Sequence, residues 1–430
     1  MTRRVAIATL GCKVNQFETA DMAQQFRAAG WELVPFSAQA DLYLINSCTV
    51  TGRSDAESRR LVRRARRTNP AATVVATGCY AQVQPEALAA LPELDQVLGN
   101  EEKFQIVAAI ESGADHVTDL GTLKQAGPLR LTSHLEHTRA FLQVQTGCEN
   151  GCSYCIVPAA RGPNRSVPPD EVTAAIQRLT GEEGYREVVL AGIHLGAYGL
   201  DLRPATSLTG LIDRLLAETA LPRLRLGSIE PNELTDELLE RFVTSNRLCP
   251  HLHIPLQSGC DTVLTRMGRR YTADFYRRLV DRAAALLPEA FIAADLIAGF
   301  PGESEAEFEA TCRLVEQLPL ASLHLFPYSR RPGTPAAGMP DQVPSPVITR
   351  RAELLRRMAA DKHAAFQKRF IGSTLPVLGL RHDARHGMVT GLARNYLEVR
   401  YPAGATWLNR EVTVQVTGSE QGMLLGIRKS

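Results

Sequence analysis

Three cysteines near the middle of the chain, Cys148, Cys152 and Cys155, stand close enough in sequence to hold one metal centre. Thiolates at this spacing bind iron in [4Fe–4S] clusters, and three of them leave one iron free to hold another molecule. A structural zinc site is the alternative, but it needs a fourth cysteine or histidine, and the next histidine is His194. The spacing therefore predicts a three-cysteine iron–sulfur site.

A second set of cysteines, Cys12, Cys48 and Cys79, is spread over the first part of the chain, each at the end of a predicted strand. Alternating strands and helices predict an α/β domain with a doubly wound parallel sheet, in which the carboxyl ends of the strands share one edge. We therefore expect these cysteines to converge on a second cluster site. The predicted strands are 5–10, 31–36, 41–46, 73–77 and 96–98, and the predicted helices are 18–29, 55–68 and 85–91.

The other cysteines and several histidines have simpler interpretations. Nine cysteines in a large chain without a secretion signal predict metal binding or catalysis rather than disulfides. Outside the two sets, Cys249, Cys260 and Cys312 are expected to be small buried or half-buried side chains. The histidines interpreted as packing residues rather than proton carriers are His194, His251 and His253.

A second alternating series of strands and helices begins near residue 139. It predicts a partial or full TIM-type β/α barrel, whose active site lies at the carboxyl ends of its strands. Cys148 follows the first of these strands, at the mouth of the barrel. The predicted strands are 140–145, 187–190, 223–229, 251–255, 291–297 and 322–326.

The pattern changes again after a long predicted helix over residues 346–370. Short strands between turns predict a small all-β barrel, with strands at 374–380, 387–392, 396–400, 411–417 and 423–428. The expected domains are an α/β domain over 1–112, a linker over 113–138, the central barrel over 139–370 and the β-barrel over 371–430.

Composition and charge restrict the class of protein only weakly. The chain has 430 residues and a formal net charge of +2, which neither requires nor excludes nucleic acid. It has no apolar run near the ~18 residues that span a bilayer and no signal-peptide pattern at its start. We therefore expect a cytoplasmic protein without a membrane partner.

A run of arginines in the predicted helix 55–68 has two interpretations, a solvated helix face and a surface for a nucleic-acid backbone. The only carboxylates close in sequence are Asp55 and Glu57, one turn earlier, where they suit the positive end of the helix dipole. The arginines are Arg59, Arg60, Arg63, Arg64, Arg66 and Arg67.

The spacing of Cys148, Cys152 and Cys155 at the start of a β/α barrel resembles the radical S-adenosylmethionine superfamily. The resemblance implies that the open iron binds the methionine part of the cofactor and that reduction cleaves the cofactor to a 5′-deoxyadenosyl radical, while the protein positions and shields it. Later segments resemble the cofactor motifs of this superfamily in their order along the chain. The implied cofactor contacts are Tyr154, Gly192, Ser228, Glu230, Gln257 and Asp295.

The position of Cys12, Cys48 and Cys79 on a separate domain before the barrel resembles the second-cluster ligands of the methylthiotransferases, and the C-terminal β-barrel resembles their RNA-binding TRAM module. The resemblance implies two [4Fe–4S] clusters, one that generates the radical and one that holds the sulfur to be methylated and transferred. It also implies two molecules of S-adenosylmethionine per turnover, an electron donor such as flavodoxin or ferredoxin, and a sulfur donor.

The segment 10–16, LGCKVNQ, is similar to the branch that acts on threonylcarbamoyladenosine in tRNA. This implies methylthiolation at C2 of that base, next to the anticodon, in a stem-loop whose single-stranded bases can be splayed out. The alternatives are the same chemistry on isopentenyladenosine or on a ribosomal protein side chain, and a non-catalytic iron–sulfur RNA-binding protein. The segment 156–163, IVPAARGP, departs from the family pattern at the expected wall of the substrate pocket.

Overall fold

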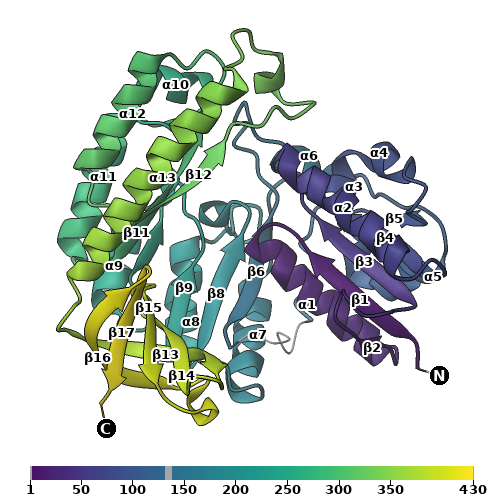
Figure 1. Ribbon diagram of the computed structural model, residues 1–430, viewed down its shortest axis with the longest axis horizontal. Helices are drawn as coiled ribbons and strands as arrows, with labels where there is room; N and C mark the ends of the chain where they lie inside the picture. The colour runs from purple at the N-terminus through teal and green to yellow at the C-terminus, as the bar shows by residue number, and fades with distance from the viewer. Residues whose placement is uncertain (1, 131–137, 430) are drawn as a thin grey trace.

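The computed structural model describes residues 2–130 and 138–429, and the chain forms three units in sequence order (Figure 1). The strands of the first unit are β1 (Arg4–Thr9), β2 (Glu32–Leu33), β3 (Leu42–Ser47), β4 (Thr73–Gly78) and β5 (Gln96–Val97). Its helices are α1 (Lys13–Ala28), α2 (Gly52–Thr68), α3 (Cys79–Val83), α4 (Pro85–Ala89) and α5 (Ile106–Glu111). The sheet is parallel, with the order β2-β1-β3-β4-β5. Apolar side chains of α1 and α5 cover one face, and those of α2 cover the other.

Two helices of this unit begin earlier than the sequence pattern predicts. α1 begins at Lys13 rather than at residue 18, because the extended backbone of Cys12 marks the end of the turn from β1. α2 begins at Gly52 rather than at residue 55, because the Thr51 side chain caps it by accepting a hydrogen bond from the Ser54 N–H. Both helices therefore start beside the edge of the sheet that carries the cysteines.

The central unit is a partial barrel of six parallel strands. These are β6 (Ala140–Thr146), β8 (Glu187–Gly192), β9 (Arg223–Leu226), β10 (His251–His253), β11 (Phe291–Ala298) and β12 (Ser322–Pro327). Single parallel bridges, Leu224 to Leu248 and Ser228 to His253, connect the β9 and β10 edges. In the described residues no pairing joins β12 to β6, so the barrel stays open. A short strand that the sequence pattern did not predict, β7 (Arg165–Ser166), runs antiparallel to β6.

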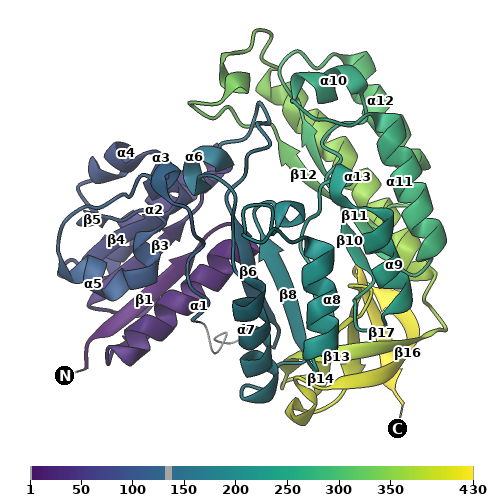
Figure 2. The same cartoon turned by 180° about the vertical axis from the view of Figure 1, so that it is seen from behind.

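Helices fill the connections of the central unit, and Figure 2 shows α7 and α8 in front of β6 and β8. Their apolar faces and the strands share one continuous core. The helices are α6 (Val157–Arg161), α7 (Pro169–Gly181), α8 (Leu208–Glu218), α9 (Asp236–Thr244), α10 (Asp261–Arg266), α11 (Ala273–Leu286), α12 (Glu305–Gln317) and α13 (Ser345–Lys368).

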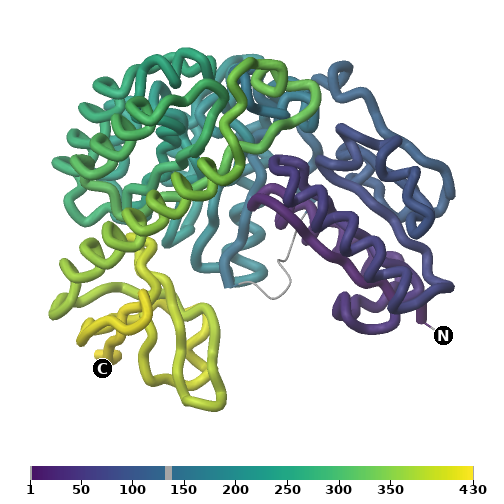
Figure 3. Tube along the Cα trace, turned by 45° about the horizontal axis from the view of Figure 1, so that its top comes forward, coloured from purple at the N-terminus to yellow at the C-terminus, as the bar shows by residue number. Residues whose placement is uncertain are grey.

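The C-terminal unit is a closed five-stranded barrel with the order β13-β14-β15-β17-β16. Its strands are β13 (Thr374–Asp383), β14 (Met388–Ala393), β15 (Glu398–Pro402), β16 (Glu411–Glu420) and β17 (Met423–Arg428). Phe366 at the end of α13 and the nearby Phe370 pack into the same core as the strand residues Val377, Val399 and Val414. The small barrel is therefore anchored on the last helix of the central unit, and Figure 3 shows both end units against the central one.

The N-terminal unit contacts both free edges of the partial barrel. Helix α1 packs along β6. On the other edge Arg331, which follows β12, donates to Thr49 Oγ1 at 2.8 Å and to Asp55 Oδ2 at 2.5 Å. The N-terminal unit therefore bridges the opening between the first and last strands of the barrel.

The predicted linker 113–138 is described only in part, since residues 131–137 lie outside the described residues. Its first part packs on the N-terminal sheet, where the His116 N–H donates to the Val97 carbonyl at 3.0 Å, and Leu120 is buried. Within the described ranges no helix is long and apolar enough to cross a membrane.

Candidate active site

The N-terminal triad, Cys12, Cys48 and Cys79, lies at one edge of the N-terminal sheet. Its members follow β1, β3 and β4, which are neighbouring parallel strands, so their carboxyl ends meet. The structure thus brings together cysteines that are far apart in sequence. Burial raises the pKa of the Cys48 thiol, and the neighbouring Cys79 and Cys12 raise it further. A metal-bound thiol loses its proton, so three cysteines on neighbouring strand ends can act together as thiolate ligands of a metal cluster.

Two glycines allow the strand ends to approach each other here. Gly11 and Gly78 have φ values of +99° and +98°, a region that side chains rarely adopt. A Cβ atom at Gly11 would lie 2.9 Å from the Cβ of Cys48, and one at Gly78 would lie 2.5 Å from the carbonyl oxygen of Ser47. A side chain at either position would push the strand ends apart and open the triad.

The barrel triad, Cys148, Cys152 and Cys155, occupies the loop after β6. The Cys155 N–H donates to the Cys152 carbonyl at 3.1 Å, and a Cβ at Gly147 would lie 1.8 Å from the carbonyl oxygen of Pro163. Burial raises the pKa of Cys155 to about 12, and Cys152 and Cys148 contribute to the rise. Three thiolates on one tight loop fit the three protein-held irons of a [4Fe–4S] cluster.

His194 lies beside this triad, where it has polar partners in addition to its packing contacts. Its side chain is hydrogen-bonded to Cys148, and its Nε2 lies 2.5 Å from Glu233 Oε1. Burial lowers the pKa of His194, but the hydrogen bonds with Cys148 and Glu233 outweigh it and raise the pKa to about 10. His251, by contrast, is buried and stacks on Tyr396, as a packing histidine should.

A cavity of about 190 Å³ lies between the barrel loop and the N-terminal unit. Val50 and Thr51, which follow Cys48 closely in the chain, form one side of it. Cys155 of the barrel loop also lines it. Three predicted cofactor contacts also line this shared cavity, namely Tyr154, Gln257 and Asp295.

The other predicted cofactor contacts lie elsewhere around the barrel mouth. Glu230 lines a smaller cavity, of about 40 Å³, that also includes Cys152. It is paired with Arg269, whose Nη1 donates to Cys152 Sγ at 3.2 Å. Gly192 ends β8 and Ser228 follows β9, and neither lines these two cavities. Sequence reasoning missed Arg269, because no motif surrounds it and the fold alone brings it to the sulfur.

A polar cluster formed by His253, Asp295 and His324 reaches the shared cavity through Asp295. The residues come from the neighbouring strands β10, β11 and β12, and the imidazole nitrogens lie 2.6 Å and 3.1 Å from Asp295 Oδ1. Burial raises the pKa of Asp295, but the hydrogen bonds to both imidazoles outweigh it and lower the pKa to about 2. His253 is therefore part of a polar site rather than only a packing residue.

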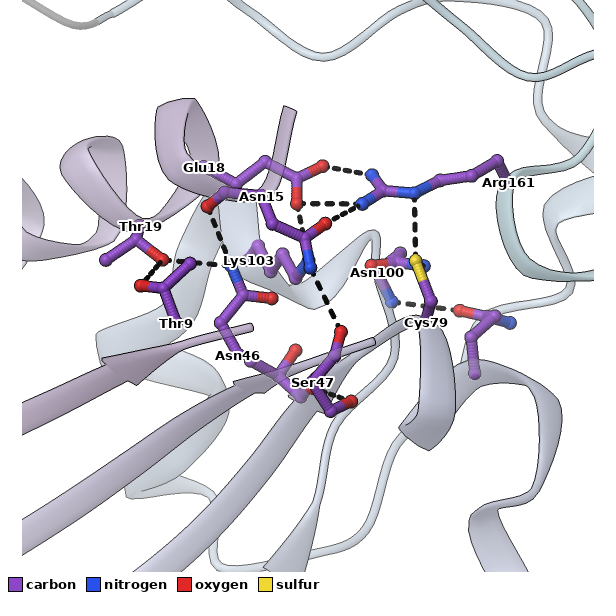
Figure 4. A network of polar contacts seen from close by, with 12 residues as sticks. Thr9, Asn15, Glu18, Thr19, Asn46, Ser47, Cys79, Asn100, Lys103 and Arg161 are labelled. Atoms are coloured by element: carbon purple, nitrogen blue, oxygen red, sulfur yellow. Dashed lines mark hydrogen bonds and ion pairs between the residues drawn. The ribbon is translucent and has the colours of Figure 1, made fainter. Parts of the chain in front are cut away.

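A buried ion network underlies the N-terminal triad (Figure 4). Arg161, at the end of α6, is only 3% exposed, and its Nε donates to Cys79 Sγ at 3.3 Å. Its Nη groups bind Glu18 and Asn15 on α1, and Lys103 Nζ lies 2.5 Å from Glu18 Oε2. The sequence analysis includes Arg161 only as part of the segment 156–163. Its role at the N-terminal triad could not be predicted, because its partners belong to the other unit.

The arginine-rich face of α2 has more carboxylate partners than its sequence neighbourhood predicts. The expectation that only Asp55 and Glu57 are near is wrong, because the fold brings residues 93 and 95 to the helix while Asp55 is buried against Arg331. Arg64 and Arg67 are exposed, and no ion pair involves them in the described part of the chain. The pairs on this face are Arg60 with Glu57, Arg63 with Glu93 and Arg66 with Asp95.

Comparison with known sequences finds two family models and many relatives. Residues 4–99 match the family described as Uncharacterized protein family UPF0004, and residues 142–315 match the Radical SAM superfamily. The chain is 37% identical to threonylcarbamoyladenosine tRNA methylthiotransferase MtaB of Bacillus subtilis, over 96% of this chain and 93% of that protein. It is 33% identical to a tRNA-2-methylthio-N(6)-dimethylallyladenosine synthase of Cereibacter sphaeroides, over 99% of this chain and 98% of that protein.

Comparison with solved structures supports the fold. The chain resembles the radical S-adenosylmethionine methyltransferase TsrM from Kitasatospora setae, with a TM-score of 0.56 and 18% identity over 78% of this chain and 77% of that one. It also resembles the cobalamin-dependent radical enzyme OxsB, with a TM-score of 0.51 and 13% identity over 85% of this chain and 56% of that one. At such low identity these similarities concern the fold alone.

Proposed function

Because this chain belongs to the radical S-adenosylmethionine methylthiotransferase family and is a transferase, we propose that it methylthiolates C2 of threonylcarbamoyladenosine next to the anticodon of tRNA. The barrel triad holds a [4Fe–4S] cluster that binds S-adenosylmethionine, and the N-terminal triad holds a second cluster that carries the sulfur. The two closely related substrate classes, isopentenyladenosine and a ribosomal protein side chain, are the competing assignments.

The observation that carries this proposal is the shared cavity. Its lining includes Cys155 of the barrel triad together with Val50 and Thr51, which closely follow Cys48 of the N-terminal triad. A base bound in this cavity would lie against Cys155 and against the segment that follows Cys48 in the chain. A radical and a sulfur atom can act on the same carbon only if both sites reach that carbon, since reacting groups must be held in a productive geometry.

The polar cluster at the cavity favours a polar base modification over an apolar one. An ionised Asp295 can accept a hydrogen bond from a carbamoyl N–H, and an imidazole N–H of His253 or His324 can donate to a carbamoyl or carboxylate oxygen. An isopentenyl group offers no such partner, and a site built for hydrogen bonds rejects an analogue that lacks them. The polar cluster therefore supports the threonylcarbamoyl base, as does the similarity to the Bacillus subtilis protein.

The residues around the triads position the cofactor and the base. When bound, the barrel cluster and S-adenosylmethionine supply the radical that removes the hydrogen at C2. Tyr154 and Gln257 would contact the cofactor in the shared cavity, and Glu230 lines a second cavity together with Cys152. Electrons and sulfur come from partners, an electron donor such as flavodoxin or ferredoxin and a sulfur donor.

Mass spectrometry of tRNA nucleosides from a deletion strain tests the assignment. Threonylcarbamoyladenosine should accumulate without its 2-methylthio form, while methylthiolated isopentenyladenosine stays at its normal level. A plasmid copy of the gene should restore the modification, and a Cys48→Ala copy should not. Loss of the isopentenyl product instead would assign the other base, and unchanged tRNA with an unmodified ribosomal protein would assign the protein substrate.

A further inference from the structure

Arg161 connects the two triads physically. Helix α6 begins two residues after Cys155 and ends at Arg161, whose side chain reaches into the N-terminal unit (Figure 4). There its Nε donates to Cys79 Sγ at 3.3 Å, and the carbonyl of the preceding Ala160 accepts a hydrogen bond from Asn100 Nδ2 at 2.7 Å. One short helix thus starts beside a cysteine of the barrel triad and ends on a sulfur of the other triad.

The buried charged groups around Arg161 carry a net positive charge beside the Cys79 sulfur. Glu18 accepts hydrogen bonds from both Nη groups of Arg161 and from Lys103 Nζ, and the three side chains are almost fully buried. Burial raises the pKa of Glu18, but the two cations outweigh it and hold the pKa below its ordinary value. One carboxylate therefore faces two cations, in an environment where hydrogen bonds are stronger than in water.

The same network fixes the backbone before the other two cysteines of the N-terminal triad. Arg161 Nη2 donates to Asn15 Oδ1. Asn15 Nδ2 in turn donates to the carbonyls of Leu10 and Ser47, at 2.6 Å and 3.1 Å. Leu10 lies two residues before Cys12, and Ser47 directly precedes the next cysteine of the triad, so the guanidinium is linked to all three ligand positions.

We propose that Arg161 is a positioning residue that raises the reduction potential of the N-terminal cluster through its hydrogen bond to Cys79 and thereby links that cluster to the loop of the barrel triad. The inference rests on the second cluster proposed above. Hydrogen bonds to cluster sulfurs and nearby positive charge stabilise the reduced, more negative cluster. If Arg161 only neutralised Glu18, removing both side chains together would leave the potential unchanged.

A redox titration that separates charge from hydrogen bonding tests the proposal. The background is Cys148→Ala/Cys152→Ala/Cys155→Ala, in which only the N-terminal cluster contributes to the electron paramagnetic resonance signal. Adding Glu18→Gln and Arg161→Gln together removes one charge of each sign, so the net charge stays the same while the N–H···S bond is lost. We expect this protein to be at least tenfold harder to reduce, a shift of about 59 mV to more negative potential for one electron.

The matched control is Glu303→Gln/Arg351→Gln, which removes another buried arginine together with its buried carboxylate partner, a pair that makes no hydrogen bond with a cysteine of either triad among the described residues. Its potential should equal that of the background protein. An unchanged potential in the Glu18→Gln/Arg161→Gln protein, with its iron retained, would overturn the inference. Loss of iron from that protein but not from the control would support the positioning role. A background protein that binds no iron at all would instead contradict the second cluster of the proposed function.

Discussion

At the scale of single residues, the two triads differ in where their cysteines and neighbouring side chains come from in the chain. The barrel triad is local in sequence, and its contacts Arg269 and His194 come from distant parts of the barrel. The N-terminal triad is assembled from three strands, and its closest cation, Arg161, comes from the loop that holds the barrel triad. Each cluster site therefore depends on the fold around it and not only on its ligands.

Iron content tests whether the two triads bind independent clusters. Two [4Fe–4S] clusters correspond to about eight irons per chain after anaerobic reconstitution. Replacing the three cysteines of the barrel triad by alanine should leave about half of the iron, because the N-terminal triad is built by other strands. Cys312→Ala, outside both triads, is the control and should keep all of it. A fall to zero in the triad variant would show that the sites are not independent.

Cofactor cleavage tests the division of roles between the triads. The variant Cys12→Ala/Cys48→Ala/Cys79→Ala keeps every residue of the barrel triad and of the barrel side of the shared cavity. It should still cleave S-adenosylmethionine to 5′-deoxyadenosine after reduction, and it should form no methylthiolated tRNA. Chromatography of both products gives the answer. Lost cleavage with an intact barrel-cluster spectrum would mean that the triads do not act separately.

At the scale of elements, the sequence predicts which segments form strands. It predicts less well which residues of different elements lie side by side. All six predicted strands of the central barrel are present, because strand and helix patterns alternate along this part of the chain. The starts of α1 and α2 were missed, since they depend on the backbone of Cys12 and on the Thr51 cap. The polar cluster around Asp295 and the carboxylates beside α2 could not be predicted, because strand order and loop packing bring their residues together.

The exposed part of the α2 arginine run tests its proposed contact with tRNA. Arg64 and Arg67 are the exposed members without an ion pair among the described residues, whereas Arg60 is held by Glu57. Arg64→Gln/Arg67→Gln should weaken tRNA binding and flatten its salt dependence by about one unit of log–log slope per lost phosphate contact. Arg60→Gln, the control, should change both much less. Equal affinity and slope in all three proteins would make the run a solvated helix face.

At the scale of the whole molecule, buried ion pairs join the units. Glu187 on β8 binds Arg223 and Arg225 on β9, and all three are fully buried. The same arginines reach the C-terminal barrel, where Arg223 donates to Glu411 at 2.7 Å and Arg225 donates to the Arg394 carbonyl at 3.0 Å. These contacts therefore hold the C-terminal barrel against the central barrel.

Glu411→Gln tests this connection. It removes a charged hydrogen-bond partner from Arg223 and Arg394, which should lower the free energy of unfolding by about 2 kcal/mol. Burial raises the pKa of Glu411, but hydrogen bonds from Arg394 and the charge of Arg223 outweigh it and lower the pKa. A lowered pKa stabilises the folded state above the ordinary carboxyl pKa, and this stability is lost only as the pH falls through the folded value.

The difference in unfolding free energy between the parent protein and Glu411→Gln should therefore stay constant from about pH 8 to about pH 5 and shrink only below that. Urea denaturation across this range measures it. Glu398→Gln is the matched control, because its partner Arg381 is exposed on the same barrel and exposed pairs contribute roughly 0–1 kcal/mol. If Glu411→Gln proves as harmless as this control, or if its effect already fades between about pH 8 and pH 6, the buried pair does not hold the C-terminal barrel in place.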